Sequence, residues 1–113
     1  MKKIVAALVL GFLAMAFMVP PTKVTFKVYG NCGQCKERIE TALDQKGIKS
    51  AEWNVESKMI EVVYVPEKIT LDQIHKIING VGHDTEKSKA ADSIYQKLPD
   101  CCLYRENPNT HAN

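Results

Sequence analysis

The sequence lacks several features that would indicate common classes of function. The chain has 15 basic and 13 acidic residues, and two of the basic ones, Lys2 and Lys3, belong to the N-terminal segment described below. Without these two lysines the basic and acidic residues are equal in number, so no net positive charge remains that would favour nucleic-acid binding. It has no second C-x-x-C motif and no histidine pair at zinc-finger spacing, which argues against a zinc ribbon. No serine or pair of acids stands in a context that suggests catalytic turnover. We therefore expect no enzyme and no nucleic-acid partner.

The N-terminal segment has the pattern of an export signal. A short basic start (MKK) precedes an uncharged apolar run over residues 4–13, and Ala14-Met15-Ala16 supplies the small residues of a signal-peptidase site. A retained membrane anchor reaching residue 21 is the alternative, but Pro20 and Pro21 end the run short of the roughly 20 apolar residues that a membrane-spanning helix needs. We predict a signal peptide over residues 1–16 and a periplasmic or other extracytoplasmic location.

The most informative motif is a C-x-x-C pair, Cys32 and Cys35, between a predicted strand and a predicted helix. Apolar and polar residues alternate over residues 23–29, as in a half-buried strand, and apolar residues recur at helical spacing from Cys35 to Leu43. At a helix N-terminus, free N–H groups and the helix dipole favour thiolates, which select soft ions such as Cu(I) and Hg(II). The motif therefore indicates either a soft-metal carrier or a dithiol redox site, with both thiols in an exposed loop.

The pattern after this helix predicts a small mixed domain. Strands are expected over residues 48–55 and 59–65, and Thr70 and Gln73 form a capping box that begins a second helix. A fourth strand, if formed, is short and lies near residues 84–87. The order βαββαβ predicts an α+β sandwich of the ferredoxin-like type, an antiparallel sheet with two helices on one face. Three aromatic residues are expected in the core and sheet: Phe26, Trp53 and Tyr64.

A C-terminal extension carries a second cysteine pair. A short third helix is expected over residues 90–98, followed by Cys101 and Cys102 and a polar tail. Four cysteines in a small exported chain are compatible with disulfides, but a disulfide between adjacent residues is strained. We expect Cys101 and Cys102 to be accessory thiols that bind metal or reach back to the first pair. The chain thus divides into residues 1–16, a domain over 22–88 and an extension over 89–113.

A longer register accompanies the C-x-x-C motif through the second helix. It comprises Cys32, Cys35, Ile39, Glu40, Ala42, Leu43, Gly47, Ile48, Ser50, Ala51, Val55, Val62, Tyr64, Pro66, Ile69, Thr70, Leu71, Ile74, Ile77 and Gly82. With this register, residues 23–84 resemble the heavy-metal-associated domain family, which includes copper chaperones, copper-ATPase N-terminal domains and periplasmic mercury-binding proteins.

The resemblance implies a function. In that family, paired thiolates bind one soft ion and pass it to a partner by ligand exchange. It implies a Cu(I) chaperone or scavenger whose partner is a metal-transporting membrane protein or another metallochaperone. The alternatives are a mercury(II)-binding protein and a thiol-disulfide oxidoreductase that uses the same cysteines. A membrane contact is expected only through the N-terminal segment, if that segment is not cleaved.

The chain departs from the family pattern near the motif. The loop Gly30-Asn31-Cys32 is one residue shorter than usual and has no methionine. His83 stands where the family often has an aromatic residue or lysine facing the metal loop, so it is a candidate third ligand, or a group that tunes the site as it titrates between about pH 6 and 7. Lys36 and Arg38 either offset thiolate charge or lie on a solvated helix face, and we favour the solvated face. His75 is also expected to be solvated.

Overall fold

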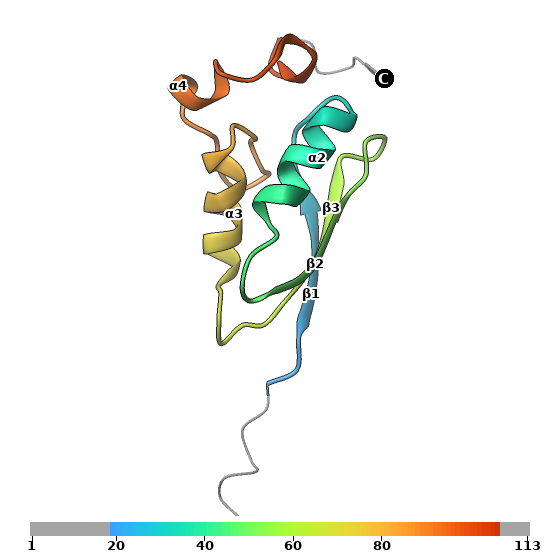
Figure 1. The fold of residues 1–113 in the computed structure, drawn as a ribbon, viewed down its shortest axis with the longest axis vertical. Coiled ribbons are helices and arrows are strands. Elements are labelled where there is room, and N and C mark those ends of the chain that lie inside the picture. The colour runs from blue at the N-terminus through green and yellow to red at the C-terminus, as the bar shows by residue number, and fades with distance from the viewer. Residues whose placement is uncertain (1–18, 107–113) are drawn as a thin grey trace, which may run out of the picture.

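The computed structural model of the protein describes residues 19–106 (Figure 1). Its elements are β1 (Thr22–Lys27), α2 (Gly33–Ala42), β2 (Ile48–Trp53), β3 (Met59–Tyr64), α3 (Leu71–Gly80), α4 (Asp92–Tyr95) and a 3₁₀ helix, η1 (Asp100–Cys102). The predicted signal peptide lies outside the described residues and remains a prediction. Within residues 19–106, no helix combines the length and apolar character needed to cross a membrane.

The three strands form one antiparallel sheet in the order β1-β3-β2, with α2 and α3 side by side on one face (Figure 1). Val24 pairs with Val62, and Phe26 pairs with Ile60. The predicted ferredoxin-like fold is confirmed. The fourth strand is reduced to a single bridge between Val28 and Thr85. It ends there because the Thr85 hydroxyl accepts bonds from the backbone N–H groups of Lys87 and Ser88, which turns the chain away from the sheet.

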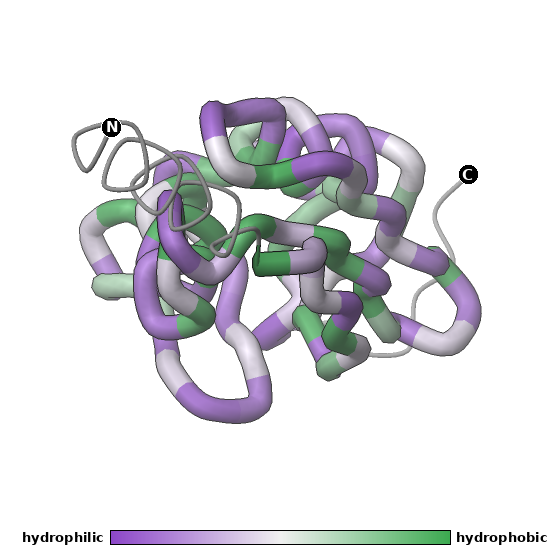
Figure 2. Tube along the Cα trace, turned by 90° about the horizontal axis from the view of Figure 1, so that it is seen from below, coloured by the Kyte–Doolittle hydropathy of each residue, from purple (hydrophilic) through white to green (hydrophobic). Residues whose placement is uncertain are grey.

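The core lies between the sheet and the two helices. Green hydrophobic and purple hydrophilic residues alternate along much of the chain, as expected for elements buried on one side (Figure 2). The three predicted core aromatics are confirmed, since Phe26, Trp53 and Tyr64 are all buried. The Trp53 indole N–H donates to the Val28 carbonyl at 2.9 Å, which satisfies the polar atom of this buried ring.

Helix α3 begins at the predicted capping box. The Thr70 hydroxyl accepts from the Gln73 backbone N–H at 3.1 Å, and the Gln73 side chain accepts from the Thr70 N–H at 2.9 Å. The expectation that His75 is solvated is wrong. This residue is buried on α3, its Nδ1 lies 2.7 Å from the Thr85 hydroxyl oxygen, and its ring packs on Phe26. The bridge between Val28 and Thr85 places the Thr85 hydroxyl next to the buried His75 ring. This long-range contact cannot be recognised from the residues around His75 in the sequence.

The C-terminal extension folds back across the end of the domain where α2 begins and α3 ends (Figure 1). The predicted third helix over residues 90–98 is shorter, because only the four residues of α4 are helical before turns lead to Pro99. Leu98 packs on Gly82, where a Cβ atom would approach Leu98 Cδ2 to 2.9 Å and where φ is +101°. Glycine at this position therefore permits both the left-handed turn and the close approach of the extension.

Candidate metal centre

The C-x-x-C pair lies at the start of α2, as its spacing predicted. Cys32 is the N-cap, with extended backbone angles, and Cys35 lies in the first turn. Their Sγ atoms are 3.7 Å apart, and the Asn31 backbone N–H donates to the Cys35 sulfur at 3.4 Å. Both sulfurs are therefore at the positive end of the helix dipole, where backbone N–H groups stabilise a thiolate.

The short loop before the motif packs on Trp53 instead of being anchored by a methionine. A Cβ atom added to Gly30 would lie 3.1 Å from the Trp53 ring and 3.1 Å from Cys35 Cβ. The absence of a side chain at Gly30 lets the loop backbone approach the indole closely. Because Trp53 is fully buried and hydrogen-bonded, the loop rests on a fixed part of the core.

A third sulfur joins the pair from the extension. The Sγ of Cys102 is 3.5 Å from that of Cys32, and the ligand atoms of Cys32, Cys35 and Cys102 all lie within 4.8 Å of one another. The exposed fractions of the three residues are 3%, 0% and 0%. The expectation that the C-x-x-C thiols occupy an exposed loop is therefore wrong, because the extension covers them. All four cysteines are free thiols, with no disulfide among them.

One cationic side chain contacts this three-sulfur cluster, defined as Cys32, Cys35 and Cys102. The Arg38 guanidinium donates from Nη1 to the Cys102 sulfur at 3.2 Å. The preference for a solvated Arg38 is therefore wrong, because its helix face is turned toward the extension. Lys36 instead pairs with Glu40 and donates to the Trp53 carbonyl at 2.9 Å, so it braces α2 against β2.

The surroundings of Cys32 and Cys102 shift the pKa values of their thiols in opposite directions. Burial raises the pKa of the Cys32 thiol, but the backbone N–H of Cys35 and the neighbouring thiols outweigh it and lower this pKa to about 7. The pKa of Cys102 is raised, first because the thiol is buried and next through its hydrogen bond with Cys35, while Arg38 opposes the rise. Near neutral pH, Cys32 is thus partly ionised, whereas the raised pKa of Cys102 favours its protonated form.

His83 is not part of the three-sulfur cluster. It is fully buried, its Nδ1–H donates to the Tyr29 carbonyl at 2.8 Å, and its ring stacks on Tyr104. Burial lowers the pKa of His83 to about 4, against the opposing hydrogen bond to Tyr29. The expected titration between pH 6 and 7 is therefore wrong, because the extension removes the ring from water.

Cys101 also lies outside the cluster, although it neighbours Cys102. It is partly exposed, its thiol donates to the Gln34 side-chain oxygen at 3.2 Å, and its Sγ is 3.7 Å from that of Cys102. The two adjacent cysteines therefore differ: Cys102 points to the first pair and Cys101 to the rim of α2.

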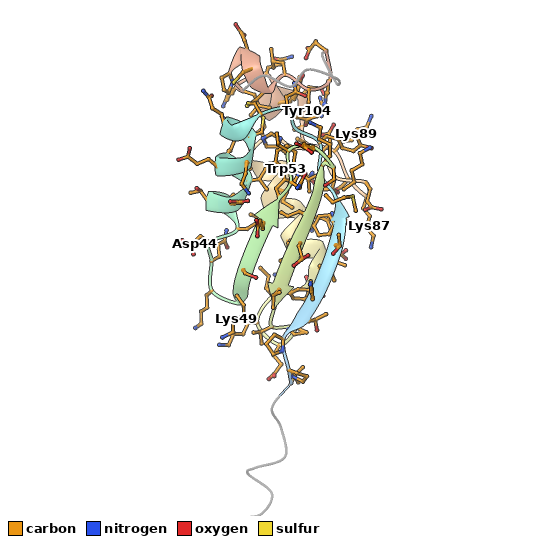
Figure 3. All side chains as sticks on the ribbon, turned by 90° about the vertical axis from the view of Figure 1, so that its right-hand side faces the viewer. Asp44, Lys49, Trp53, Lys87, Lys89 and Tyr104 are labelled. Carbon is orange, nitrogen blue, oxygen red and sulfur yellow. The ribbon has the colours of Figure 1, made fainter. Side chains whose placement is uncertain are left out.

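The residues that hold the extension in place were not found from the sequence. Tyr104 belongs to the extension and lies where it meets the rest of the domain (Figure 3); its hydroxyl donates to the Gly82 carbonyl at 2.7 Å and accepts from the Asp84 N–H at 2.8 Å. Arg105 forms two bonds to the Asp84 carboxylate, at 3.0 and 2.8 Å. We call Tyr104, Arg105 and Asp84 the clamp. No periodicity marks these residues, so only their long-range contacts reveal them.

Comparison with known proteins identifies the domain that carries this site. A family model described as "Heavy-metal-associated domain" matches residues 25–84, more than half of the chain. The chain belongs to this family. The copper chaperone CopZ of Staphylococcus aureus (strain bovine RF122 / ET3-1) is 36% identical over 55 residues, which cover 48% of this chain and 81% of that protein. The predicted family resemblance is confirmed.

Solved structures agree with this assignment. A CopZ metallochaperone superposes with a TM-score of 0.54 at 32% identity, covering 57% of this chain and 98% of that one. The N-terminal domain of a potential copper-translocating P-type ATPase from Bacillus subtilis, in the Cu(I)-loaded state, has a TM-score of 0.56 at 26% identity, covering 66% and 95%. The protein thus contains a copper chaperone-like domain with a C-x-x-C site. The family match ends at residue 84, so Cys102 lies outside it.

Proposed function

We propose that this protein binds Cu(I) through the thiolates of Cys32 and Cys35 and passes the ion to a partner by ligand exchange. The observation that carries the proposal is the pair of sulfurs 3.7 Å apart at the N-terminus of α2, in a chain whose relatives are copper chaperones. Thiolates are soft ligands that select Cu(I). In ligand exchange, one metal–sulfur bond forms to an incoming thiolate as another breaks, so the ion is never released to water.

The local electrostatics support this role. The lowered pKa of Cys32 provides a thiolate near neutral pH, which is the form that attacks or accepts a soft ion. The Asn31 N–H bond to the Cys35 sulfur offsets part of the negative charge that two thiolates bring. The partner is a metal-transporting membrane protein or another metallochaperone, since relatives include a copper chaperone and a domain of a P-type ATPase.

The proposed setting is outside the cytoplasm. It is supported by the basic start, apolar run and small residues at positions 14 and 16, a pattern typical of an export signal. Intact-mass analysis of the protein purified from its native compartment tests this part, and the expected species begins after Ala16. A membrane-bound species that retains residues 1–16 would contradict cleavage.

Anaerobic competition titration tests the choice of metal. Reduced protein is titrated with Cu(I), Hg(II) and Zn(II) against a competing chelator for each, and one equivalent of Cu(I) is expected to bind most stably relative to its chelator. Preferential retention of Hg(II) would support the mercury-binding alternative. Weak binding of every metal, together with disulfide reductase activity, would support the oxidoreductase alternative instead.

A further inference from the structure

The position of Cys102 is not explained by the family fold. It lies 70 residues from Cys32 in sequence and outside the matched residues 25–84, yet it is fully buried with its sulfur 3.5 Å from that of Cys32. A buried thiol that served only to fill space would need neither a cationic partner nor contact with two other thiols. Cys102 has both, because Arg38 donates to it and the C-x-x-C sulfurs surround it.

The spacing of the three sulfurs fits a single soft ion. Metal–thiolate bonds are about 2.3 Å long for a first-row metal such as zinc, so three sulfurs in a plane around one ion stand about 4 Å apart. Two of the observed separations are 3.5 and 3.7 Å, and all three are within 4.8 Å. An ion held linearly by two sulfurs instead needs them about 4.6 Å apart at this bond length. The observed cluster is closer to the three-coordinate arrangement.

The charge of the surroundings also fits a third thiolate. Three thiolates around Cu(I) leave an excess of negative charge in a buried site, which is costly unless a cation or oriented dipoles offset it. Arg38 lies 3.2 Å from the Cys102 sulfur, and the N-terminus of α2 faces the other two sulfurs. Burial alone lowers the pKa of Arg38, but the bond to Cys102 and the neighbouring thiols raise it, so the guanidinium remains charged.

The clamp fixes Cys102 over the motif. Tyr104 bonds to the backbone of Gly82 and Asp84, and Arg105 bonds to the Asp84 carboxylate, within three residues of Cys102. Arg105 also donates to the Ala90 carbonyl at 2.8 Å, which ties residue 105 to the start of the extension. The third sulfur is therefore presented by a segment that is anchored to the domain at several points, as a preorganised ligand requires.

We propose that Cys102 is the third thiolate ligand of the metal ion, that Arg38 positions and neutralises it, and that the extension closes the site. This inference rests on the proposed function, because it assumes that Cys32 and Cys35 bind the ion. Handover to a partner then begins when an incoming thiol replaces Cys102: the bond between the metal and Cys102 breaks, a bond to the incoming sulfur forms, and the proton that the incoming thiol loses passes to the Cys102 sulfur.

X-ray absorption spectroscopy of the reduced full chain, loaded with one equivalent of Cu(I) from its acetonitrile complex, tests the proposal. We expect three sulfur neighbours in the wild-type protein and in Cys101→Ser, and two in Cys102→Ser. Cys101 is the matched control, because it is the adjacent thiol and lies outside the cluster. Two sulfurs in the wild-type protein, a third sulfur retained in Cys102→Ser, or its loss in Cys101→Ser would each overturn the assignment.

Arg38 is tested separately as a positioning residue. Arg38→Gln is expected to keep three sulfurs and to weaken Cu(I) affinity about 10- to 100-fold, the range typical of groups that contact a ligand and not the metal. Arg38→Lys restores the charge and is expected to recover part of that loss. An unchanged affinity in Arg38→Gln would overturn its role. If the wild-type chain binds no Cu(I), or if Cys32→Ala/Cys35→Ala binds it normally, the proposed function fails instead.

Discussion

Removing one hydroxyl from the clamp tests how firmly the extension is attached. In Tyr104→Phe the ring keeps its packing against His83 and Tyr95, but the Gly82 carbonyl and the Asp84 N–H lose the partner that each has at 2.7 and 2.8 Å. Each buried polar group left without a partner costs about 1–3 kcal/mol, so the free energy of unfolding should fall by at least about 2 kcal/mol. That loss is a large part of the 5–15 kcal/mol typical of a small domain.

Urea unfolding of the reduced, metal-free protein measures this loss. With an m-value of about 1–2 kcal/mol/M, the transition midpoint of Tyr104→Phe should fall by about 1 M or more at unchanged slope. Tyr29→Phe is the control, because Tyr29 is exposed and its substitution should change stability by less than about 0.5 kcal/mol. If both variants unfolded at the wild-type midpoint, the hydroxyl of Tyr104 would not anchor the extension.

Three further predictions follow from single contacts. Burial raises the pKa of Asp84, but bonds from Arg105 and the Ala90 N–H hold this pKa below its ordinary value of 3.8. The stability that the Asp84 carboxylate contributes is therefore present above pH 3.8 and is lost as the pH falls through the lowered pKa. The loss of unfolding free energy in Asp84→Asn should shrink between about pH 7 and pH 3, and an equal loss at both pH values would refute this. Thr70→Ala should lower the free energy of unfolding, measured with urea, by about 1 kcal/mol. An unchanged free energy would show that the capping box does not stabilise α3. Cys102→Ser should release Cu(I) to a competing chelator faster than Cys101→Ser in stopped-flow measurements, and equal rates would contradict closure of the site.

The fold could be predicted because the patterns that specify its strands and helices involve residues close together in sequence. Alternation over β1, the helical spacing after Cys35 and the capping box at Thr70 each involve neighbouring residues, and all three are present in the structure. The position of the C-x-x-C pair at a helix N-terminus followed from the same local patterns. The fourth strand was expected to be short and near residues 84–87, and it is a single bridge at Thr85, because the Thr85 hydroxyl also begins a turn.

The completed site could not be predicted because it depends on long-range contacts. Three contacts complete the site: Cys102 with Cys32, Arg38 with Cys102, and Tyr104 with Gly82. The residues of each pair are more than 20 positions apart in sequence. No spacing rule relates such residues, so the extension was expected as an accessory segment and Arg38 as solvated. The same contacts bury His83, which explains why its expected titration near neutral pH was wrong.

The most direct test of the central claim is Cu(I) binding by the wild-type protein and by Cys32→Ala/Cys35→Ala, measured anaerobically against a competing chelator. Alanine is preferred to serine because both sites are buried and a serine hydroxyl there would need a partner. The wild-type protein is expected to retain one equivalent of Cu(I), and the double variant is expected to lose it while still unfolding cooperatively in urea. Retention of Cu(I) by the folded double variant would show that Cys32 and Cys35 are not the metal ligands.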